Sequence, residues 1–315
     1  DKNNARLWND LGQAYRAIHR LKDANECYNR AAELDDSFAD PFNNLGVLSR
    51  QAGELDSAEE FYKEALLRCQ TFPEVHYNLA LVMEARGDFN SAKRYYRQAI
   101  SLRPNYMYAQ NNLGVLLINE GQLEEAEQLL EGALLVHKRS PELLTSFGTC
   151  MRNKGNLIKA TNAYRKAVRI KPDFCEAIWN LALVDLATGR FKDGWKNYRY
   201  RPTVDRAIYP IPKDAFMLDL SLRSFEIHAE QGPGDELFFL RFLPLLSSRG
   251  AKVQYYPNRL IKEICIRAMG DFLESEISNE SEKLALPDLP FLLGSPDPQP
   301  TIQVRPLDKN VKIVR

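Results

Sequence analysis

A period of 34 residues constrains this chain more than any other feature. Units of this length begin, without insertion or deletion, at Ala5, Ala39, Pro73, Met107, Pro141 and Cys175. Position seven of the unit is large and apolar throughout: Leu11, Leu45, Leu79, Leu113, Phe147 and Leu181. Position eight is always small: Gly12, Gly46, Ala80, Gly114, Gly148 and Ala182. This self-similarity predicts an array of supersecondary units, each covering the apolar face of its neighbour.

The other recurring positions predict two helices per unit. Position twenty is small: Ala24, Ala58, Ala92, Ala126, Ala160 and Gly194. Position twenty-four is large: Tyr28, Tyr62, Tyr96, Leu130, Tyr164 and Tyr198. Position twenty-seven is Ala31, Ala65, Ala99, Ala133 and Ala167, and then Arg201. Small residues let two helices approach closely, and large ones fill the space beside that contact.

Glycine and proline mark where these helices end. Position fifteen is glycine in the second to sixth units: Gly53, Gly87, Gly121, Gly155 and Gly189. Glycine there supplies the left-handed residue that ends the first helix. Pro104 and Pro172 stop the second helix in their units.

The pattern resembles the tetratricopeptide repeat (TPR) family over residues 5–201. This resemblance implies a mainly α fold, with a right-handed TPR α-solenoid of six repeats over residues 1–201. It also implies that the first helix of each repeat lines a concave groove that binds a partner protein.

Asparagine recurs at position six of the predicted first helices: Asn44, Asn78, Asn112 and Asn180. A carboxamide offers a donor and an acceptor, so a ladder of asparagines can pair with the backbone of an extended peptide. The alternative is that these residues stabilise neighbouring turns of the repeats. Triplets such as Asn44-Leu45-Gly46 resemble those in the superhelix of O-GlcNAc transferases, which implies a peptide-binding ladder, although Ser146 interrupts it.

A clamp for a C-terminal carboxylate is disfavoured by position two of the unit. That position reads Arg6, Asp40, Glu74, Tyr108, Glu142 and Glu176. Acidic side chains would repel a carboxylate. Any charge preference of the groove is therefore for a neutral or basic segment.

Composition excludes several classes of partner. Hydrophobic residues make up 44% and charged residues 27%, which is typical of a globular protein. Lys plus Arg and Asp plus Glu are 42 each, so the basic excess expected of a nucleic-acid binder or of a polybasic lipid-binding patch is missing. The longest apolar stretch, Phe238–Leu246, contains Arg241 and is too short to span a membrane.

Cysteine usage and the first residues predict a cytoplasmic protein. No basic segment followed by an apolar one begins the sequence, so no secretion signal is predicted, and a helix expected almost at once suggests a fragment of a longer chain. The five cysteines form no Cys-x-x-Cys pair, and neither they nor the four histidines show metal-ligand spacing. Free thiols in a reducing compartment and no metal site are expected. The sequence does not indicate an oligomeric state.

The periodicity stops after Arg201, and three prolines mark a linker over residues 202–222. Strands are predicted over 224–229 and 252–256, with helices over 236–248 and 258–269. This alternation predicts a small Rossmann-like α/β lobe over residues 223–315. Gly232 and Gly234 would bring a loop to the start of a helix, a natural place for an anion or polar ligand. The loop lacks the dinucleotide and P-loop signatures.

Four segments carry a second resemblance. They are Gly194-Trp195-x-x-Tyr198-x-x-Arg201, Glu230-Gln231-Gly232-x-Gly234-Asp235-Glu236, Phe239-x-Arg241-Phe242-x-Pro244 and Arg249-Gly250-Ala251-x-Val253. They resemble a bacterial group in which TPR arrays are fused to a glycosyltransferase of the two-Rossmann-domain (GT-B) type. The resemblance implies that residues 223–315 are the heptosyltransferase-like first lobe of an incomplete GT-B enzyme, with residues 311–314 beginning the missing second lobe.

Site roles follow from this resemblance. It makes Asp235 the candidate general base or acceptor contact, whereas by position alone Asp235 could be a helix-start carboxylate. His228 could orient an acceptor or simply be packed. The segment Leu286-Pro287-Asp288-Leu289-Pro290 resembles the group's Leu-x-Ser-Leu-Pro, with Asp288 in place of Ser.

Two functions remain open at this stage. The first is a protein O-glycosyltransferase whose TPR groove recruits an extended polypeptide, such as a surface or flagellar protein. It would use a nucleotide-sugar donor in the full-length protein, whereas residues 1–315 alone would be inactive and need no cofactor. The alternative is a non-enzymatic TPR scaffold with a degenerate α/β lobe.

Overall fold

The computed structural model describes residues 3–210, 220, 223–230, 232–259, 262, 265 and 281–294. The chain forms two compact units, residues 1–154 and 155–315. None of the helices within the described ranges is long and apolar enough to cross a membrane.

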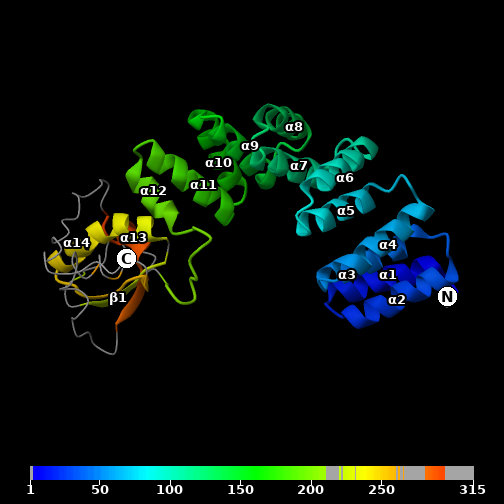
Figure 1. Cartoon of the computed structure of the whole chain (residues 1–315), viewed down its shortest axis with the longest axis horizontal. Helices are drawn as coiled ribbons and strands as arrows, with labels where there is room; N and C mark the ends of the chain where they lie inside the picture. The colour runs from blue at the N-terminus through cyan, green and yellow to red at the C-terminus, as the bar shows by residue number, and fades with distance from the viewer. Residues whose placement is uncertain are drawn as a thin grey trace, which may run out of the picture. The chain divides into compact units, whose positions relative to one another are not determined.

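The first unit consists of helices that pack in consecutive pairs (Figure 1). Their bounds are α1 Ala5–Ala17, α2 Leu21–Leu34, α3 Ala39–Gln51, α4 Leu55–Arg68, α5 Pro73–Ala85, α6 Phe89–Leu102, α7 Met107–Asn119, α8 Leu123–Val136 and α9 Pro141–Asn153. Each odd-numbered helix begins at the first residue of a predicted repeat, so the period read from the sequence is confirmed.

Each pair is held by a bulky residue of the second helix against a small residue of the first. Tyr62 is fully buried, and a Cβ added to Gly46 would lie only 2.6 Å from its ring atom Cε1. Leu130 and Gly114 repeat this arrangement, at 2.7 Å. The close approach requires glycine because any side chain would displace the buried partner. Burial also raises the pKa of Tyr62 to about 12.

The turn inside each repeat uses a left-handed residue. In the first unit the φ angles of Gly53, Gly87 and Gly121 are +83°, +79° and +77°. The first repeat has His19 at the same position, with φ +59°, and its side chain is exposed. A residue with a Cβ is strained in this conformation, whereas glycine is not.

Replacing His19 with glycine is expected to raise the free energy of unfolding of the first unit by about 0.5–1 kcal/mol, because the backbone strain is relieved. Gly87→Ala is the matched counterpart and should cost about 1 kcal/mol. A Cβ at Gly87 would meet no atom within 4 Å, so that variant isolates the backbone term. Urea titrations followed by circular dichroism measure both. A His19→Gly midpoint at or below that of the unchanged protein would contradict the strain argument.

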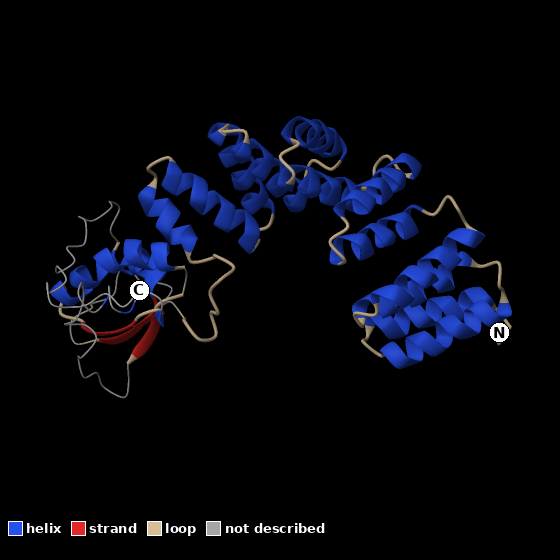
Figure 2. Cartoon of the chain, viewed as in Figure 1, coloured by secondary structure: helices blue, strands red, loops and turns tan. Residues whose placement is uncertain are grey.

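The second unit begins with three more helices of the repeat pattern, which are α10 Leu157–Ile170, α11 Cys175–Ala187 and α12 Phe191–Tyr198. After them comes a sheet of three parallel strands, β1 Ser224–His228, β2 Lys252–Tyr256 and β3 Glu282–Ala285. The strand order is β2-β1-β3, with Phe225 opposite Val253 and Glu282. Figure 2 shows the strands of this sheet in red. The parallel sheet expected from the sequence is therefore present.

Short helices cover the buried face of this sheet (Figures 1 and 2). They are α13 Pro233–Phe239, α14 Leu243–Ser248 and α16 Leu289–Leu293, with 3-10 turns η2 Leu240–Phe242 and η5 Leu286–Asp288. The predicted helix over 236–248 starts earlier, at Pro233, and is interrupted by η2. Pro244 causes the interruption because it has no N–H to donate to the carbonyl of Leu240.

Aromatic packing joins α12 to this sheet. The ring of Trp195 lies 5.3 Å from that of Tyr198 and 5.8 Å from that of Phe239. These residues share one core with Phe225 and Ile227 of β1. The motif that begins at Gly194 thus has a packing role, which is to bury the last repeat helix against the α/β part.

Two predicted elements fall wholly or largely beyond what the structure describes. The strand predicted over 311–314 lies outside the described residues, as does most of the helix predicted over 258–269. Within the latter, Lys262 and Cys265 are helical.

Candidate functional site

The asparagine ladder connects neighbouring repeats. Asn44 Nδ2 donates to Asn9 Oδ1 at 2.8 Å, and Asn78 Nδ2 donates to Asn43 Oδ1 at 2.9 Å. Position six of one repeat thus binds position five of the repeat before it. Asn44 and Asn78 are only 6% and 8% exposed. This geometry favours the structural alternative for these two residues, and their contact with a peptide stays a prediction.

The other members of the ladder have different partners. Ser146 Oγ, which interrupts the asparagines, donates to Asn111 Oδ1 at 2.8 Å and so preserves the contact between repeats. Asn112 Nδ2 donates to the hydroxyl of Tyr96 at 3.1 Å. Asn180 Nδ2 donates to the backbone carbonyl of Glu176 at 2.9 Å. Asn112 is half-buried and Asn180 is buried, and in both residues the amide nitrogen already donates to a group of the protein.

Three tyrosines form a surface on the third and fourth repeats, which we call the tyrosine surface: Tyr77 of α5, Tyr106 before α7 and Tyr108 of α7. The Tyr77 and Tyr106 ring centroids are 5.2 Å apart, and those of Tyr106 and Tyr108 are 6.5 Å apart in an edge-on arrangement. Tyr108 is 58% exposed. Exposed tyrosines supply large contact area at low entropic cost, which makes them frequent binding residues.

Carboxylates lie on the first helices beside the tyrosine surface. Burial raises the pKa of Asp40 above its ordinary value, and the charges of Glu74 and Asp10 raise it further. Glu74 also pairs with Arg103, whose guanidinium lies 4.9 Å from the Tyr106 ring. Asp10, Asp40 and Glu74 lie on α1, α3 and α5, so acidic groups gather on the first helices of the first three repeats.

At the carboxyl edge of the sheet, His228 ends β1. Parallel α/β sheets bind ligands at this edge. The His228 ring stacks on Tyr256, with centroids 4.6 Å apart, and its Nε2 lies 3.5 Å from Glu226 Oε2 without a hydrogen bond. Burial lowers the pKa of His228 although Glu226 is near. The histidine is therefore packed against Tyr256, and its role toward an acceptor stays a prediction.

The predicted glycine loop lies where α13 begins. Gly232 precedes the helix, and Gly234 and Asp235 belong to its first turn. Asp235 is exposed, and in the part of the chain that the structure describes no hydrogen bond or ion pair joins it to His228 or to another side chain. Its neighbour Glu236 is buried and accepts hydrogen bonds from the hydroxyl of Tyr255 and, at 3.0 Å, from the backbone N–H of Asn258.

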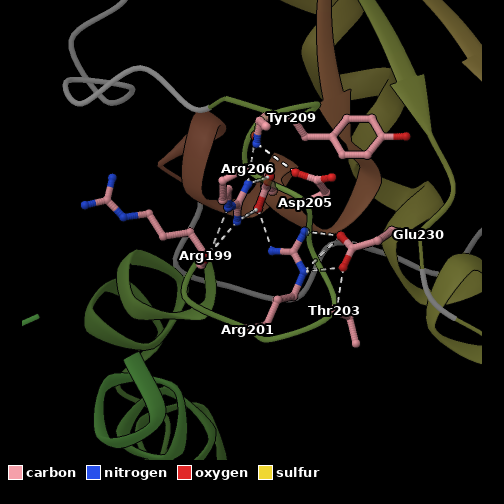
Figure 3. A network of polar contacts seen from close by, with 9 residues as sticks. Arg199, Arg201, Thr203, Asp205, Arg206, Tyr209 and Glu230 are labelled. Atoms are coloured by element: carbon pink, nitrogen blue, oxygen red, sulfur yellow. Dashed lines mark hydrogen bonds and ion pairs between the residues drawn. The ribbon is translucent and has the colours of Figure 1, made fainter. Parts of the chain in front are cut away.

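A buried ion-pair network links two of the four segments that carry the second resemblance with the segment 286–290 (Figure 3). Arg201 is fully buried and donates from Nε to both carboxylate oxygens of Glu230 at 3.0 Å. Its Nη1 donates to Asp288 Oδ1 at 2.6 Å, and Arg206 Nη1 donates to Asp288 Oδ2 at 2.6 Å. Thr203 Oγ1 adds a 2.6 Å hydrogen bond to Glu230. Burial alone would lower the pKa of Arg201, but the two carboxylates outweigh it and the pKa is raised.

One signal in the sequence points to this network. Arg201 occupies position twenty-seven, where the five preceding repeats have an alanine that is completely buried. A charged residue at a buried position needs charged partners. The partners are 29 and 87 residues further along the chain, so the sequence alone does not identify them. Asp288, which replaces a serine of the resembling group, is one of them.

The helix pairs define a repeat protein in which the two helices of a repeat pack through a recurring contact between a small and a large residue. Profiles described as tetratricopeptide repeats match residues 5–38, 37–105, 83–145 and 141–174. Because these matches together span residues 5–174, more than half of the chain, the chain belongs to the tetratricopeptide repeat family. Among curated proteins, no sequence matches this chain.

Solved structures share the fold. PilW, a type IV pilus biogenesis factor, is 16% identical, with a TM-score of 0.57, over 66% of this chain and 95% of that one. PilF of Pseudomonas aeruginosa is 17% identical, with a TM-score of 0.56, over 61% and 88%. A tetratricopeptide repeat protein of Parabacteroides merdae is 18% identical, with a TM-score of 0.52, over 62% and 77%. At these identities the likeness concerns the fold alone.

Proposed function

We propose that the chain is a protein-binding TPR scaffold, and that the tyrosine surface of the first unit binds an extended, basic or neutral segment of a partner protein. The carrying observation is the exposed Tyr108 packed beside Tyr77 and Tyr106. The preference for a neutral or basic segment is supported by the carboxylate of Asp40, which complements positive charge, whereas Glu74 already pairs with Arg103.

Glycosyl transfer, the more specific function predicted from the sequence, stays a prediction. The parallel sheet is compatible with a Rossmann-like, GT-B lobe, but the family matches cover only the repeats. Asp235 has no partner among the described residues that would hold it as a base. The first turn of α13 carries the exposed Asp235, whose carboxylate would repel the phosphates of a nucleotide-sugar donor at this loop. The described residues therefore favour the scaffold over the enzyme.

Tyr108→Ala is expected to weaken peptide binding roughly 5- to 30-fold, because truncating an exposed aromatic anchor removes about 1–2 kcal/mol of binding energy. Peptides selected from a random displayed library against the protein would be labelled, and their dissociation constants measured by fluorescence anisotropy. Phe89→Ala is the matched control, since Phe89 is 49% exposed but lies on a second helix, α6. Equal affinities of the Tyr108 variant and the unchanged protein would place the binding face elsewhere.

Two further readouts belong to the same titration. Because the pKa of Asp40 is raised, Asp40 loses its charge at a higher pH than an ordinary aspartate, so affinity for a basic peptide should fall as the pH drops through that pKa.

Asn78→Ala separates the two roles of the ladder. A loss of stability with unchanged affinity supports the contact between repeats, whereas a loss of affinity at unchanged stability supports a peptide contact.

A further inference from the structure

A cavity in the second unit is lined by an arginine, Arg199, that has no carboxylate partner among the described residues. The cavity measures about 610 Å³, and its lining includes Arg199, Tyr200, Pro202, Val204, Arg206 and Pro210. A volume of this size is within the range of small-molecule sites, which are mostly apolar with few polar anchors. The tyrosine surface is in the other unit, so the cavity is separate from the proposed peptide site.

The arginines at this cavity are not equivalent. Arg201 and Arg206 pair with Glu230 and Asp288. Arg199 has no carboxylate partner among the described residues, and Figure 3 shows its side chain pointing away from the ion-pair network. Asp205, the third carboxylate of this cluster, is exposed and accepts a hydrogen bond from the backbone N–H of Ala207. Among the described residues, Arg199 is thus the arginine of this cluster whose guanidinium forms no ion pair.

The position of Arg199 is fixed by its neighbours. Its guanidinium carbon lies 5.2 Å from the ring centroid of Tyr200 and also 5.2 Å from that of Phe291. Its backbone carbonyl accepts a hydrogen bond from Arg206 Nε at 3.1 Å. Aromatic rings hold a guanidinium in place without neutralising its charge, so its N–H groups remain available to an anion.

We propose that this cavity binds a small organic anion, a carboxylate or phosphate monoester with a compact apolar body. Arg199 binds the anionic group through paired N–H donors, which match the geometry of both anions. The apolar body contacts Pro202, Val204 and Pro210. The tyrosine surface lies beside acidic side chains, so it disfavours an anion. We therefore expect the two sites to bind different ligands.

Cys175 provides a local reporter because its exposed thiol also lines the cavity. Phenyl phosphate and benzoate are the probes, benzamide is the neutral analogue, and inorganic phosphate tests the anionic group alone. The rate of iodoacetamide modification at Cys175 is followed by peptide mass spectrometry, with Cys69 as the internal reference. Phenyl phosphate or benzoate should slow modification of Cys175 at least fivefold at saturation, with no effect at Cys69. The probe that protects Cys175 more strongly shows whether the cavity prefers a phosphate monoester or a carboxylate. Inorganic phosphate should protect Cys175 less than either probe.

The variant that tests the assignment is Arg199→Met, with Arg249→Met as an exposed control on the same unit. Protection by the anions should disappear in Arg199→Met and persist in Arg249→Met. Val204→Phe fills the cavity while keeping Arg199, and it should also abolish protection, so the test does not depend on one variant folding. Protection by benzamide equal to that by benzoate, protection that survives in Arg199→Met, or no protection by either anion would overturn the proposal.

Discussion

Arg201→Met is expected to lower the free energy of unfolding of the second unit by about 3–5 kcal/mol, because it leaves a buried carboxylate without its partner. The side chains of Glu230 and Asp288 are 7% and 2% exposed, so water cannot replace the guanidinium. Asp288 keeps Arg206, whereas Glu230 keeps only the hydroxyl of Thr203 among the described side chains. Urea unfolding followed by tryptophan fluorescence measures the loss, since Trp179 and Trp195 both pack near Tyr198 in this unit.

Two controls separate the lost ion pair from lost packing. Arg206→Met removes a partner that is 32% exposed and leaves Asp288 bound to Arg201, so a loss of only about 1 kcal/mol is expected. Adding Glu230→Gln to Arg201→Met removes the unpaired charge and should recover part of the stability. Equal losses in the two single variants, with no recovery in the double variant, would show that the network is not what stabilises this unit.

Tyr62→Ala is expected to cost the first unit about 3–5 kcal/mol, the range for emptying a buried aromatic position. Tyr62 is fully buried and its ring fills the space over Gly46, so alanine would leave a cavity between α3 and α4. Denaturant titration followed by circular dichroism of the helices gives the measurement.

The chain itself supplies the matched control for this variant. Leu130 occupies the equivalent position of the fourth repeat and packs over Gly114 in the same way. Tyr62→Leu should therefore cost clearly less than Tyr62→Ala, because leucine fills most of the volume. If the two substitutions are equally destabilising, the tyrosine contributes something other than the filling of space.

The repeats could be predicted from the sequence because their cause is local and recurrent. Small residues at positions eight and twenty and the glycine at position fifteen specify two helices and a turn, and α3, α5 and α7 begin where the period placed them. The strand over 252–256 was also predicted with its correct bounds. The predicted start of α13 was wrong, although Pro233 after Gly232 is a helix-start signal, since proline is favoured in the first turn.

The side-chain partners could not be predicted in this way. Asn78 has the same place in its repeat whether it binds a peptide or Asn43, and only the packing of neighbouring repeats decides between them. Arg201 meets Asp288 across 87 residues because the sheet folds back onto α12. Asp235 and His228 were singled out by resemblance and by strand-end position, and the structure brings neither into contact with the other.

The ladder between repeats also bears on how such an array can change in length during evolution. Asn9 with Asn44, Asn43 with Asn78, and Asn111 with Ser146 are each separated by 35 residues, one more than the repeat. Loss of residues 39–72, a whole repeat, would bring Asn78 into the place of Asn44 opposite Asn9, and duplication of a repeat would recreate the same pair at the new junction. An insertion of any other length would put a different side chain opposite each asparagine. Gene duplication in whole repeats can therefore lengthen or shorten this part of the array while these three junctions keep their hydrogen bonds.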